Sequence, residues 1–433
     1  MSGNKKQPLV PRLRFPEFKN TAEWQSPTLG EVSEPVEERV GERKLTPVSI
    51  SAGIGFVPQA EKFGRDISGS QYKLYTVVRD GDFVYNKGNS LKFPQGCVYD
   101  LQGWGEVAAP NVFICFRLKN GYENGFYRQC FERNVHGIQL RKHITSGARS
   151  NGLLNISKEA FYGVAIPVPS HAEQQKIADC LSSLDDLIAA ETYKLDTLKT
   201  HKKGLMQQLF PREGETQPRL RFPEFQNAGE WEESPLSNFI LSLDAGVSVN
   251  AGDRPANKTE FGVLKTSAIT KGLFDPEENK VVLAEIEQSR LKESVCAGTI
   301  VICRKNTPAL VGANAYVESS HENLFLPDLL WAAKPREGVL MRFLAFILGS
   351  DKGRAALSRL AKGSSESMSN ITKPDVLAFS VMAPTPDEQQ RIADCLTSLD
   401  DLIAAQTQKL DALKTHKKGL MQQLFPSPEE VEA

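Results

Sequence analysis

LKTHKKGLMQQLFP occupies residues 198–211 and returns, letter for letter, at residues 413–426. It closes a longer repeat, in which residues 173–211 differ from residues 388–426 at only five positions. A second repeat, PRLRFPEFKNTAEW at residues 11–24, returns as PRLRFPEFQNAGEW at residues 218–231. The two offsets are 207 and 215 residues (218 − 11 and 388 − 173). The chain is therefore a tandem duplication whose halves differ mainly between the repeats.

The longer repeat carries the apolar stripe of a coiled coil. Ile and Leu recur at alternating spacings of four and three residues, which places them on one face of a helix. The predicted seam residues are Ile177, Leu181, Leu184, Ile188, Leu195, Leu198, Leu205 and Leu209 in the first copy, and Ile392, Leu396, Leu399, Ile403, Leu410, Leu413, Leu420 and Leu424 in the second.

Both copies also carry signals for the start and stop of a helix. SHAE at residues 170–173 and TPDE at residues 385–388 fit capping boxes, in which the Glu side chain reaches back to the start of the helix. Pro211 and Pro426 end the helices, because proline lacks the N–H that a helix needs. At 1.5 Å per residue each helix would be roughly 55 Å long.

Polar and small residues interrupt the stripe at matching places in the two copies. The polar ones either fix the register of a helix pair or lie at its rim in water. The glycines indicate either fraying near the terminal proline or the close approach of a second chain. The interruptions are Glu191, Lys202 and Gly204 in the first copy, and Gln406, Lys417 and Gly419 in the second.

A long helix with one narrow stripe needs a partner, and the other copy in the same chain is the economical one. We expect an antiparallel pair about a pseudo-two-fold axis. The alternative is two independent surface helices, each packed on its own domain. The residues expected to face one another are Leu198, Leu205 and Leu209 in one helix, and Leu413, Leu420 and Leu424 in the other.

The unrepeated blocks contain short β-rich runs broken by Gly, Pro and Asn. The runs are YKLYTVV (72–78), DFVYN (82–86), NVFICFRL (111–118) and TIVICR (299–304), with helical patches at MRFLAFILGS (341–350) and KGRAALSRLA (352–361). RDGDFVYNKG matches CAGTIVICRK, and NIS at residues 155–157 matches NIT at residues 370–372. We therefore predict an α+β chain, in which two β-rich globular domains of one fold are joined by two long helices that form an intramolecular antiparallel coiled coil.

The predicted organisation follows the repeats. It comprises a lead-in (1–23), a first domain (24–169), a long spacer helix (170–211), a linker with the repeated lead-in (212–230), a second domain (231–384), a second spacer helix (385–426) and an acidic tail (427–433).

Composition and missing motifs exclude several classes of protein. The chain has 433 residues, a net charge of −1 and seven scattered cysteines without a CxxC pair, which predicts reduced thiols in a cytoplasm and no zinc site. No apolar stretch is long enough to span a membrane. The sequence also lacks a phosphate loop, a GxSxG elbow, a deaminase signature and an NPPY or DPPY motif. No catalytic residue or metal ligand is predicted.

Local positive charge is concentrated in polar loops of the two blocks. Residues 125–152 hold five Lys and Arg residues, Arg128 and Arg133 among them, against Glu132 alone. Lys and Arg neutralise phosphates, while Arg, Asn and Gln bond base edges. The candidate DNA-binding residues are Asn86, Lys87, Asn89, Lys92, Arg141, Lys142 and Arg149 in the first block, and Arg304, Lys305, Asn306, Lys362 and Ser364 in the second.

The doubled helix motif, the EW…LGEV opening (residues 23–32) and GDFVYNKG (residues 81–88) resemble the specificity subunit of type I restriction–modification systems. In the second half, LSNFI and GTIVICRKN depart from these forms. The resemblance implies two target-recognition domains that read the halves of an asymmetric, bipartite site in double-stranded DNA. It also implies that the helices dock two modification (methyltransferase) subunits, which restriction (translocase–nuclease) subunits join. S-adenosylmethionine, ATP and Mg are then expected in those partners, with no cofactor or catalytic residue in this chain.

The helix length fits this arrangement. Half-sites on one face of a duplex lie about one helical turn apart, roughly 34 Å, and helices of roughly 55 Å could act as the ruler. Two alternatives stay open from the residues themselves. One is the recognition part of a fused methyltransferase or nuclease, and the other is a coiled-coil scaffold that does not bind DNA.

Overall fold

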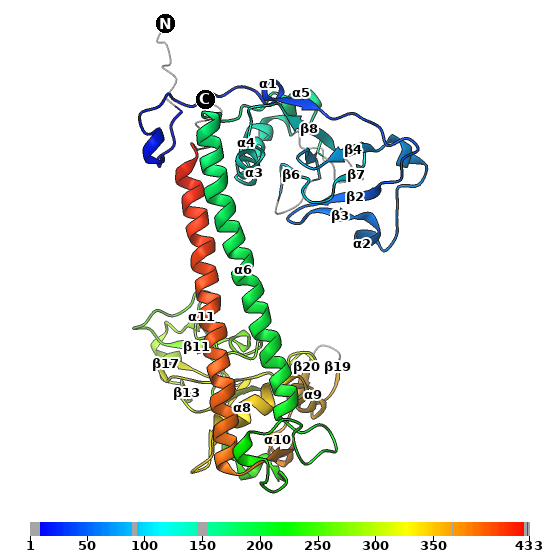
Figure 1. Cartoon of the computed structure of the whole chain (residues 1–433). Helices are drawn as coiled ribbons and strands as arrows, with labels where there is room; N and C mark the ends of the chain where they lie inside the picture. The colour runs from blue at the N-terminus through cyan, green and yellow to red at the C-terminus, as the bar shows by residue number, and fades with distance from the viewer. Residues whose placement is uncertain (1–8, 89–92, 145–153, 366–367, 428–430, 432–433) are drawn as a thin grey trace. The chain divides into compact units, whose positions relative to one another are not determined.

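The computed structural model describes residues 9–88, 93–144, 154–365, 368–427 and 431 (Figure 1). The chain divides into two compact units. Unit 1 combines Met1–Tyr193 with Thr407–Ala433, and unit 2 is Lys194–Gln406. Each unit therefore contains one globular domain and one part of each long helix.

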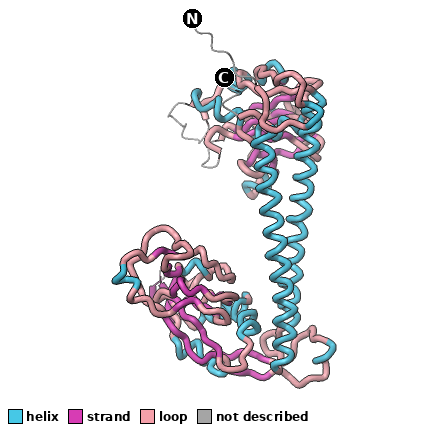
Figure 2. Tube along the Cα trace, turned by 90° about the vertical axis from the view of Figure 1, so that its left-hand side faces the viewer, coloured by secondary structure: helices cyan, strands magenta, loops and turns pink. Residues whose placement is uncertain are grey.

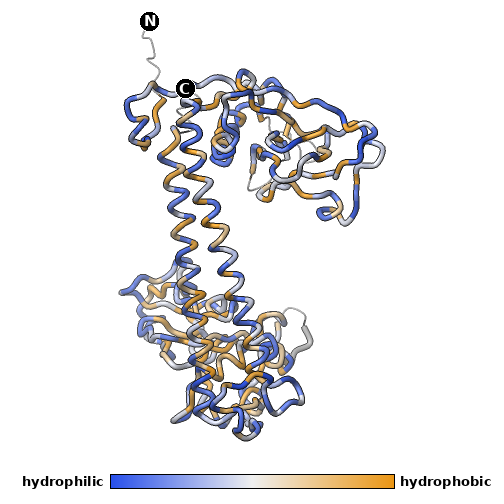
Figure 3. The backbone as a smooth tube through the Cα atoms, viewed as in Figure 1, coloured by the Kyte–Doolittle hydropathy of each residue, from blue (hydrophilic) through white to orange (hydrophobic). Residues whose placement is uncertain are grey.

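The two longer repeats form helices α6 (His171–Leu209) and α11 (Pro386–Leu424), each of 39 residues (Figure 2). Within each unit the first part of one helix lies antiparallel beside the last part of the other. Hydrophobic and hydrophilic residues alternate along both helices (Figure 3). The predicted antiparallel pairing is confirmed, and the alternative of two independent surface helices is wrong.

The sixteen predicted seam residues are all buried or half-buried. The expected facing of the two C-terminal thirds is wrong, because antiparallel helices bring the end of each against the start of the other. In unit 2, Leu205 and Leu209 pack with Ile392 and Leu396, and in unit 1, Leu420 and Leu424 pack with Ile177 and Leu181.

The charged interruptions make ion pairs between the two helices. Lys202 lies 2.5 Å from Asp400 in unit 2. Its equivalent Lys417 lies 2.8 Å from Asp185 in unit 1. Because the same Lys–Asp pair forms in both units, these residues fix the register of the seam rather than standing free in water.

The two globular domains have the same strand order and directions. Each has an antiparallel four-stranded sheet and a second four-stranded sheet with one parallel pair. In domain 1 the orders are β1-β8-β5-β6 and β3-β2-β7-β4, and in domain 2 they are β10-β18-β14-β16 and β12-β11-β17-β13. The predicted common fold is therefore confirmed.

The elements of domain 1 are, in chain order, α1 (Leu29–Val32), β1 (Ser33–Pro35), β2 (Thr46–Ser51), β3 (Gly55–Pro58), α2 (Gln59–Phe63), β4 (Thr76–Arg79), β5 (Phe83–Asn86), β6 (Cys97–Asp100), β7 (Glu106–Ala109), β8 (Ile114–Leu118), α3 (Asn124–Glu132), α4 (Val135–Leu140) and α5 (Lys158–Tyr162). The run at residues 72–78 is strand only from Thr76, since a 3-10 helix, η2 (Gly69–Leu74), takes its first part. The run at residues 111–118 becomes strand at Ile114.

The elements of domain 2 are β9 (Glu232–Pro235), β10 (Ile240–Ala245), β11 (Gly262–Leu264), β12 (Asn279–Val281), α7 (Glu285–Gln288), β13 (Ser294–Val295), β14 (Ile300–Cys303), β15 (Lys305–Asn306), β16 (Asn314–Tyr316), β17 (His321–Phe325), β18 (Leu330–Pro335), α8 (Met341–Gly349), α9 (Asp351–Arg359), β19 (Lys362–Ser365), β20 (Met368–Asn370), α10 (Lys373–Ala378) and β21 (Ser380–Ala383). The departing LSNFI segment forms a 3-10 helix, η5 (Leu236–Asn238), and buries Leu236 where domain 1 buries Leu29 of α1.

The central strands are apolar at Phe83–Tyr85 of β5 and throughout β14, because both faces of these strands are buried. Phe83 and Tyr85 of β5 point into the core shared with α3, α4 and α5, while Val84 points into the core between the sheets. In β14, Ile302 points into the core shared with α8, α9 and α10, and Val301 points into the core between the sheets.

The short repeat clamps the helix pair in each unit through a buried ion pair. Arg14 donates to Glu173 at 2.8 and 2.6 Å, and Arg221 donates to Glu388 at 2.7 Å through two nitrogens. Hydrogen bonding to the carboxylates raises the pKa of both arginines. The prediction that each Glu reaches back to the start of its helix is wrong, because Glu173 is bound to Arg14 and Glu388 to Arg221. In the first box the other half is present, since Ser170 accepts from the Glu173 N–H.

An aromatic cluster reinforces each clamp. In unit 1, Trp24 lies against Phe126 of α3 and against Phe425, with ring centroids 5.7 and 6.3 Å apart. In unit 2, Trp231 lies 6.0 Å from both Phe343 of α8 and Phe210. Phe425 and Phe210 belong to the two copies of LFP, so the end of each long helix docks on the domain of the opposite half.

Candidate nucleic-acid and assembly interfaces

A basic residue follows the central strand at the same place in each domain. Lys87 follows β5, and Arg304 follows β14. The carbonyl of each accepts a backbone N–H at 2.9 Å, from Leu154 in domain 1 and from Ile371 in domain 2. The donor segments lead into α5 and α10, whose N-caps are Ser157 and Thr372. The matched NIS and NIT motifs therefore serve as helix caps that hold the chain beside these basic residues.

In domain 2 a small sheet brings the two predicted basic segments together. Strands β15, β20 and β19 pair in that order, with Lys305 and Lys362 both in register with Asn370. Lys305 and Asn306 of β15 therefore share one sheet with Lys362 and Ser364 of β19, more than 50 residues further along the chain (362 − 305 = 57).

Two of the three predicted asparagines, Asn86 and Asn306, are held by bonds within their own domains. Asn86 donates through Nδ2 to the Ile50 carbonyl at 2.7 Å and accepts at Oδ1 from the Gly88 N–H at 2.7 Å. Asn306 accepts from the Thr307 N–H at 2.8 Å. These amides shape the strand ends, and their contact with bases stays a prediction.

In domain 1 the basic segment is only partly available for a ligand. Arg128 is paired with Asp100 at 2.8 Å. Arg133 donates to the Pro426 carbonyl at 2.9 Å and lies over the Phe425 ring. Arg141 and Lys142 are exposed in the 3-10 helix η3 (Arg141–His143). The other candidates in this domain, Asn89, Lys92 and Arg149, lie outside the described residues.

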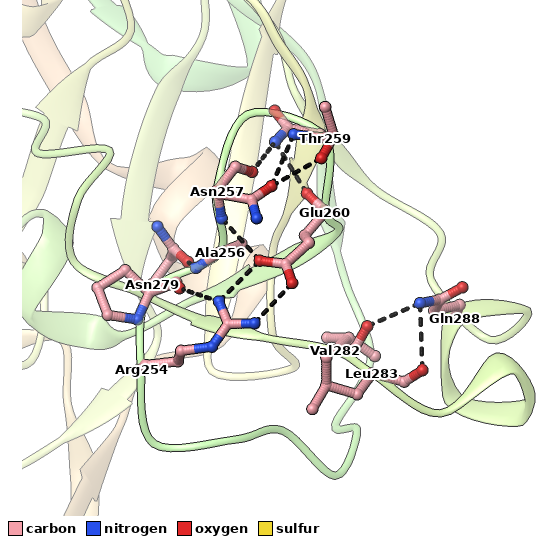
Figure 4. A network of polar contacts seen from close by, with 11 residues as sticks. Arg254, Ala256, Asn257, Thr259, Glu260, Asn279, Val282, Leu283 and Gln288 are labelled. Atoms are coloured by element: carbon pink, nitrogen blue, oxygen red, sulfur yellow. Dashed lines mark hydrogen bonds and ion pairs between the residues drawn. The ribbon is translucent and has the colours of Figure 1, made fainter.

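A polar network fixes the loop between β10 and β11 in domain 2 (Figure 4). Arg254 donates to both oxygens of Glu260 at 2.7 and 2.6 Å, and Glu260 also accepts from the Asn257 N–H at 2.9 Å. Hydrogen bonding to Arg254 lowers the pKa of Glu260 to about 2. In domain 1, Arg79 donates to one oxygen of Glu38 at 2.5 Å and to Glu106 at 2.7 Å. Hydrogen bonding to Arg79 and Arg43 lowers the pKa of Glu38 to about 2. These arginines are neutralised, so they shape the loops and offer little charge to DNA.

A second surface lies on the helix pair, on the side away from the globular domain. In unit 1 the domain touches α6 at Asp185, which accepts from Gln129 at 3.3 Å. Leu187 is two residues further, about 200° around the helix at 3.6 residues per turn, and is 41% exposed. In unit 2, Arg342 binds Asp400 at 3.5 Å, and the equivalent Leu402 is 54% exposed.

We call this surface the bare flank. It comprises Ser183, Leu187 and Ala190 in unit 1, and Ser398, Leu402 and Ala405 in unit 2, all exposed. The seam prediction did not include it, although the sequence holds the signal: a leucine off the apolar stripe that recurs in both copies.

The two helix glycines are not explained by packing within the chain. α6 and α11 continue five residues beyond Gly204 and Gly419 (209 − 204 and 424 − 419), so neither glycine lies at a helix end. A Cβ added at either position would meet nothing within 4 Å. Fraying at the helix end therefore does not account for them.

The described residues contain no group of three or more His, Cys, Asp or Glu that could hold a metal ion. None of the helices in the described ranges is long and apolar enough to cross a membrane. All seven cysteines are free.

The chain thus has two domains of one fold, with different side chains at their strand ends, joined to a duplicated pair of long helices. The family described as "Type I restriction modification DNA specificity domain" matches residues 79–200 and 229–415, which is more than half of the chain. The chain belongs to this family, and its two globular domains are target-recognition domains.

Relatives and solved structures agree with this assignment. The type I restriction enzyme MjaVIII specificity subunit of Methanocaldococcus jannaschii is 24% identical over 300 residues, 67% of this chain and 68% of that protein. The crystal structure of the S subunit of the type I restriction–modification system of M. genitalium has a TM-score of 0.60 at 13% identity, covering 97% of this chain and 100% of that one. A chain in a structure on complex assembly of the type I R-M system has a TM-score of 0.52 at 17% identity, covering 94% and 98%. At these identities the structural likeness concerns the fold.

Proposed function

We propose that the chain is the non-catalytic specificity subunit of a type I complex and that each domain reads one half of an asymmetric, bipartite site in double-stranded DNA. The observation that carries this proposal is the contrast between two domains of one fold and the different side chains at their matched strand ends. Two unlike readers on a common fold suit two unlike half-sites. The candidates for contact are Lys87, Arg141 and Lys142 in domain 1 and Arg304 and Lys305 in domain 2, together with Lys362 and Ser364, of which the structure describes only the backbone in β19.

We also propose that the helices set the spacer between the half-sites, since α6 and α11 each contribute residues to both units. Adding one heptad to each helix at matched positions should lengthen the spacer and leave both half-site sequences unchanged. Mapping methylated bases in cells that carry the altered system measures both. A change in the half-sites themselves would contradict the spacer role.

The bare flank supports the docking of two modification subunits, one on each unit. Its residues are the same in both units, and each flank has an exposed leucine with small neighbours. Small residues let a partner helix approach closely, and an exposed leucine gains free energy on burial. Restriction subunits would join through the modification subunits. S-adenosylmethionine, ATP and Mg would then act in those partners and not in this chain.

The docking proposal is tested by counting partners. The wild-type chain, purified with the modification subunit of its own system, should carry two copies by light scattering. Leu187→Glu should leave one copy, and Leu187→Glu with Leu402→Glu should leave none. Tyr193→Glu is the matched control, because Tyr193 is 77% exposed on α6 but is replaced by Gln408 in the second copy. A double variant that still carries two partners would contradict the assignment.

The competing enzymatic function makes a different prediction. Turnover of DNA by the purified chain alone, with S-adenosylmethionine or Mg²⁺, would favour a fused methyltransferase or nuclease. We expect none.

A further inference from the structure

Arg304 has its backbone fixed on both sides at the edge of the small sheet in domain 2. Its N–H donates to the Leu329 carbonyl at 3.0 Å, and its carbonyl accepts from the Ile371 N–H at 2.9 Å. The next residue begins β15. The side chain therefore starts from a rigid point, unlike a residue in an open loop.

The guanidinium is also oriented by an aromatic ring. Its central carbon lies 6.0 Å from the ring centroid of Trp331, which is 2% exposed in β18. Arginine stacks on aromatic faces and keeps its planar fork of donors. The plane of the Arg304 fork is thus restricted before any ligand binds.

This guanidinium has no acceptor among the residues that the structure describes. Its Nε is buried without a hydrogen-bond partner there. Arg14, Arg221 and Arg342, which are also buried or half-buried, are each paired with a carboxylate. A buried donor without a partner costs free energy, so a fixed and unpaired arginine at this edge indicates a ligand that brings its own acceptors.

We propose that Arg304 reads a guanine, through a bidentate contact to O6 and N7, in the half-site of the second domain. This rests on the proposed function. Two acceptors in one plane match a guanine edge, and such a contact requires the fixed fork found here. A phosphate needs no fixed plane, and exposed lysines neutralise it equally well. Adenine presents one acceptor and one donor in the major groove, which suits Asn or Gln and not Arg.

Domain 1 carries a lysine where domain 2 carries Arg304. Lys87 occupies the place of Arg304, and an ammonium lacks the planar fork. The two half-sites should therefore differ in how strictly they require guanine at this place.

The test uses the reconstituted complex and a set of duplexes in which each base pair of the mapped target is replaced in turn. The half-site of the second domain is the one that changes when residues 231–384 are exchanged. This half-site must contain a guanine. In the wild type, replacing that guanine should weaken binding about 10- to 100-fold. Arg304→Lys keeps the charge and much of the stem but loses the fork, so this discrimination should fall to a few-fold at that one pair, with the other half-site unaffected.

Lys305→Ala is the adjacent control. It should weaken binding to all duplexes alike and lower the salt dependence by about one counterion. Arg304→Gln serves as a second variant, and thermal unfolding of both Arg304 variants checks that domain 2 remains folded. If Arg304→Lys and Arg304→Gln weakened all duplexes equally, or left discrimination intact, Arg304 would not be a guanine reader. If the wild-type complex itself bound all duplexes equally, the proposed function would be contradicted instead.

Discussion

The two units share the same buried ion pair, Arg14–Glu173 in unit 1 and Arg221–Glu388 in unit 2. The residue after the central strand differs between the two domains: it is Lys87 in domain 1 and Arg304 in domain 2, whose charged groups differ in shape. The contacts of the repeated segments come in pairs: a buried Arg–Glu clamp, a Trp–Phe cluster and a Lys–Asp bond between the helices. The side chains at the strand ends are not repeated in this way. The repeated lead-ins and helices, which we call the frame, must make the same contacts in both units, while the surface of each domain can differ to suit its own ligand.

The pairing of frame contacts has a simple physical reason. Each clamp joins a lead-in to the start of the helix from its own half, and each Trp–Phe cluster adds the end of the helix from the other half. A substitution in one copy of a repeat therefore weakens one unit, and the equivalent substitution in the other copy should weaken the other unit to a similar extent.

The largest effect is expected from breaking a clamp. Glu173→Gln leaves Arg14, whose side chain is only 6% exposed, without its counter-charge. Loss of one partner of a buried pair costs about 3–5 kcal/mol. The unfolding transition of unit 1 should therefore move to a lower urea concentration. Glu388→Gln should do the same in unit 2.

The control for the clamp is an exposed ion pair of the same lead-in. Glu17 pairs with Lys176 at 3.3 Å, and both side chains are about half exposed. Glu17→Gln should change the free energy of unfolding by less than about 1 kcal/mol. Equal effects of Glu17→Gln and Glu173→Gln would show that burial of the clamp does not matter.

A smaller difference between the units is expected in acid. His136 in α4 is 1% exposed, and burial lowers its pKa to about 4. The unfolded chain takes up this proton near pH 6.5, so the contribution is complete above that pH and is lost as the pH falls toward 4. The loss is on the order of 2–3 kcal/mol. The helices α8 and α9 of domain 2 contain no histidine, so domain 2 should lack this effect.

Stability curves between pH 7 and 4 check this difference. His136→Gln should flatten the curve of unit 1 in that window. A curve that keeps its slope in the variant would assign the acid sensitivity to other groups.

The smallest effect should be a gain in stability. Gly204→Ala and Gly419→Ala each place a methyl group in open space, and alanine favours a helix by about 1 kcal/mol over glycine. Each variant should raise the unfolding temperature slightly. If the glycines serve the close approach of a partner, the stabilised variants should also bind the modification subunit less tightly. Unchanged binding would leave the glycines without a role in docking.

The sequence predicted the helices well because their signals are local. An apolar stripe, a start at residue 170 or 385 and a stop at Pro211 or Pro426 require only neighbouring residues. The shared domain fold followed from RDGDFVYNKG and CAGTIVICRK, whose apolar strands are buried on both faces.

The predictions were wrong where contacts between residues far apart in the sequence determine the structure. Glu173 fits a capping box by spacing, but Arg14, which is 159 residues away in the chain, binds its carboxylate. Arg128 contributed to a predicted basic patch, and Asp100 neutralises it. The pairing of Arg304 with Trp331, and the joining of Lys305 and Lys362 in one sheet, depend on tertiary contacts that no local pattern contains.

The most direct test exchanges one domain and maps the methylated bases. Residues 24–169 would be replaced by the corresponding block of a relative with a known and different target, with both repeats left intact. We predict that one half-site changes, and that the other half-site and the spacer are retained. A change in both half-sites, or in neither, would contradict the division between a repeated frame and two independent readers.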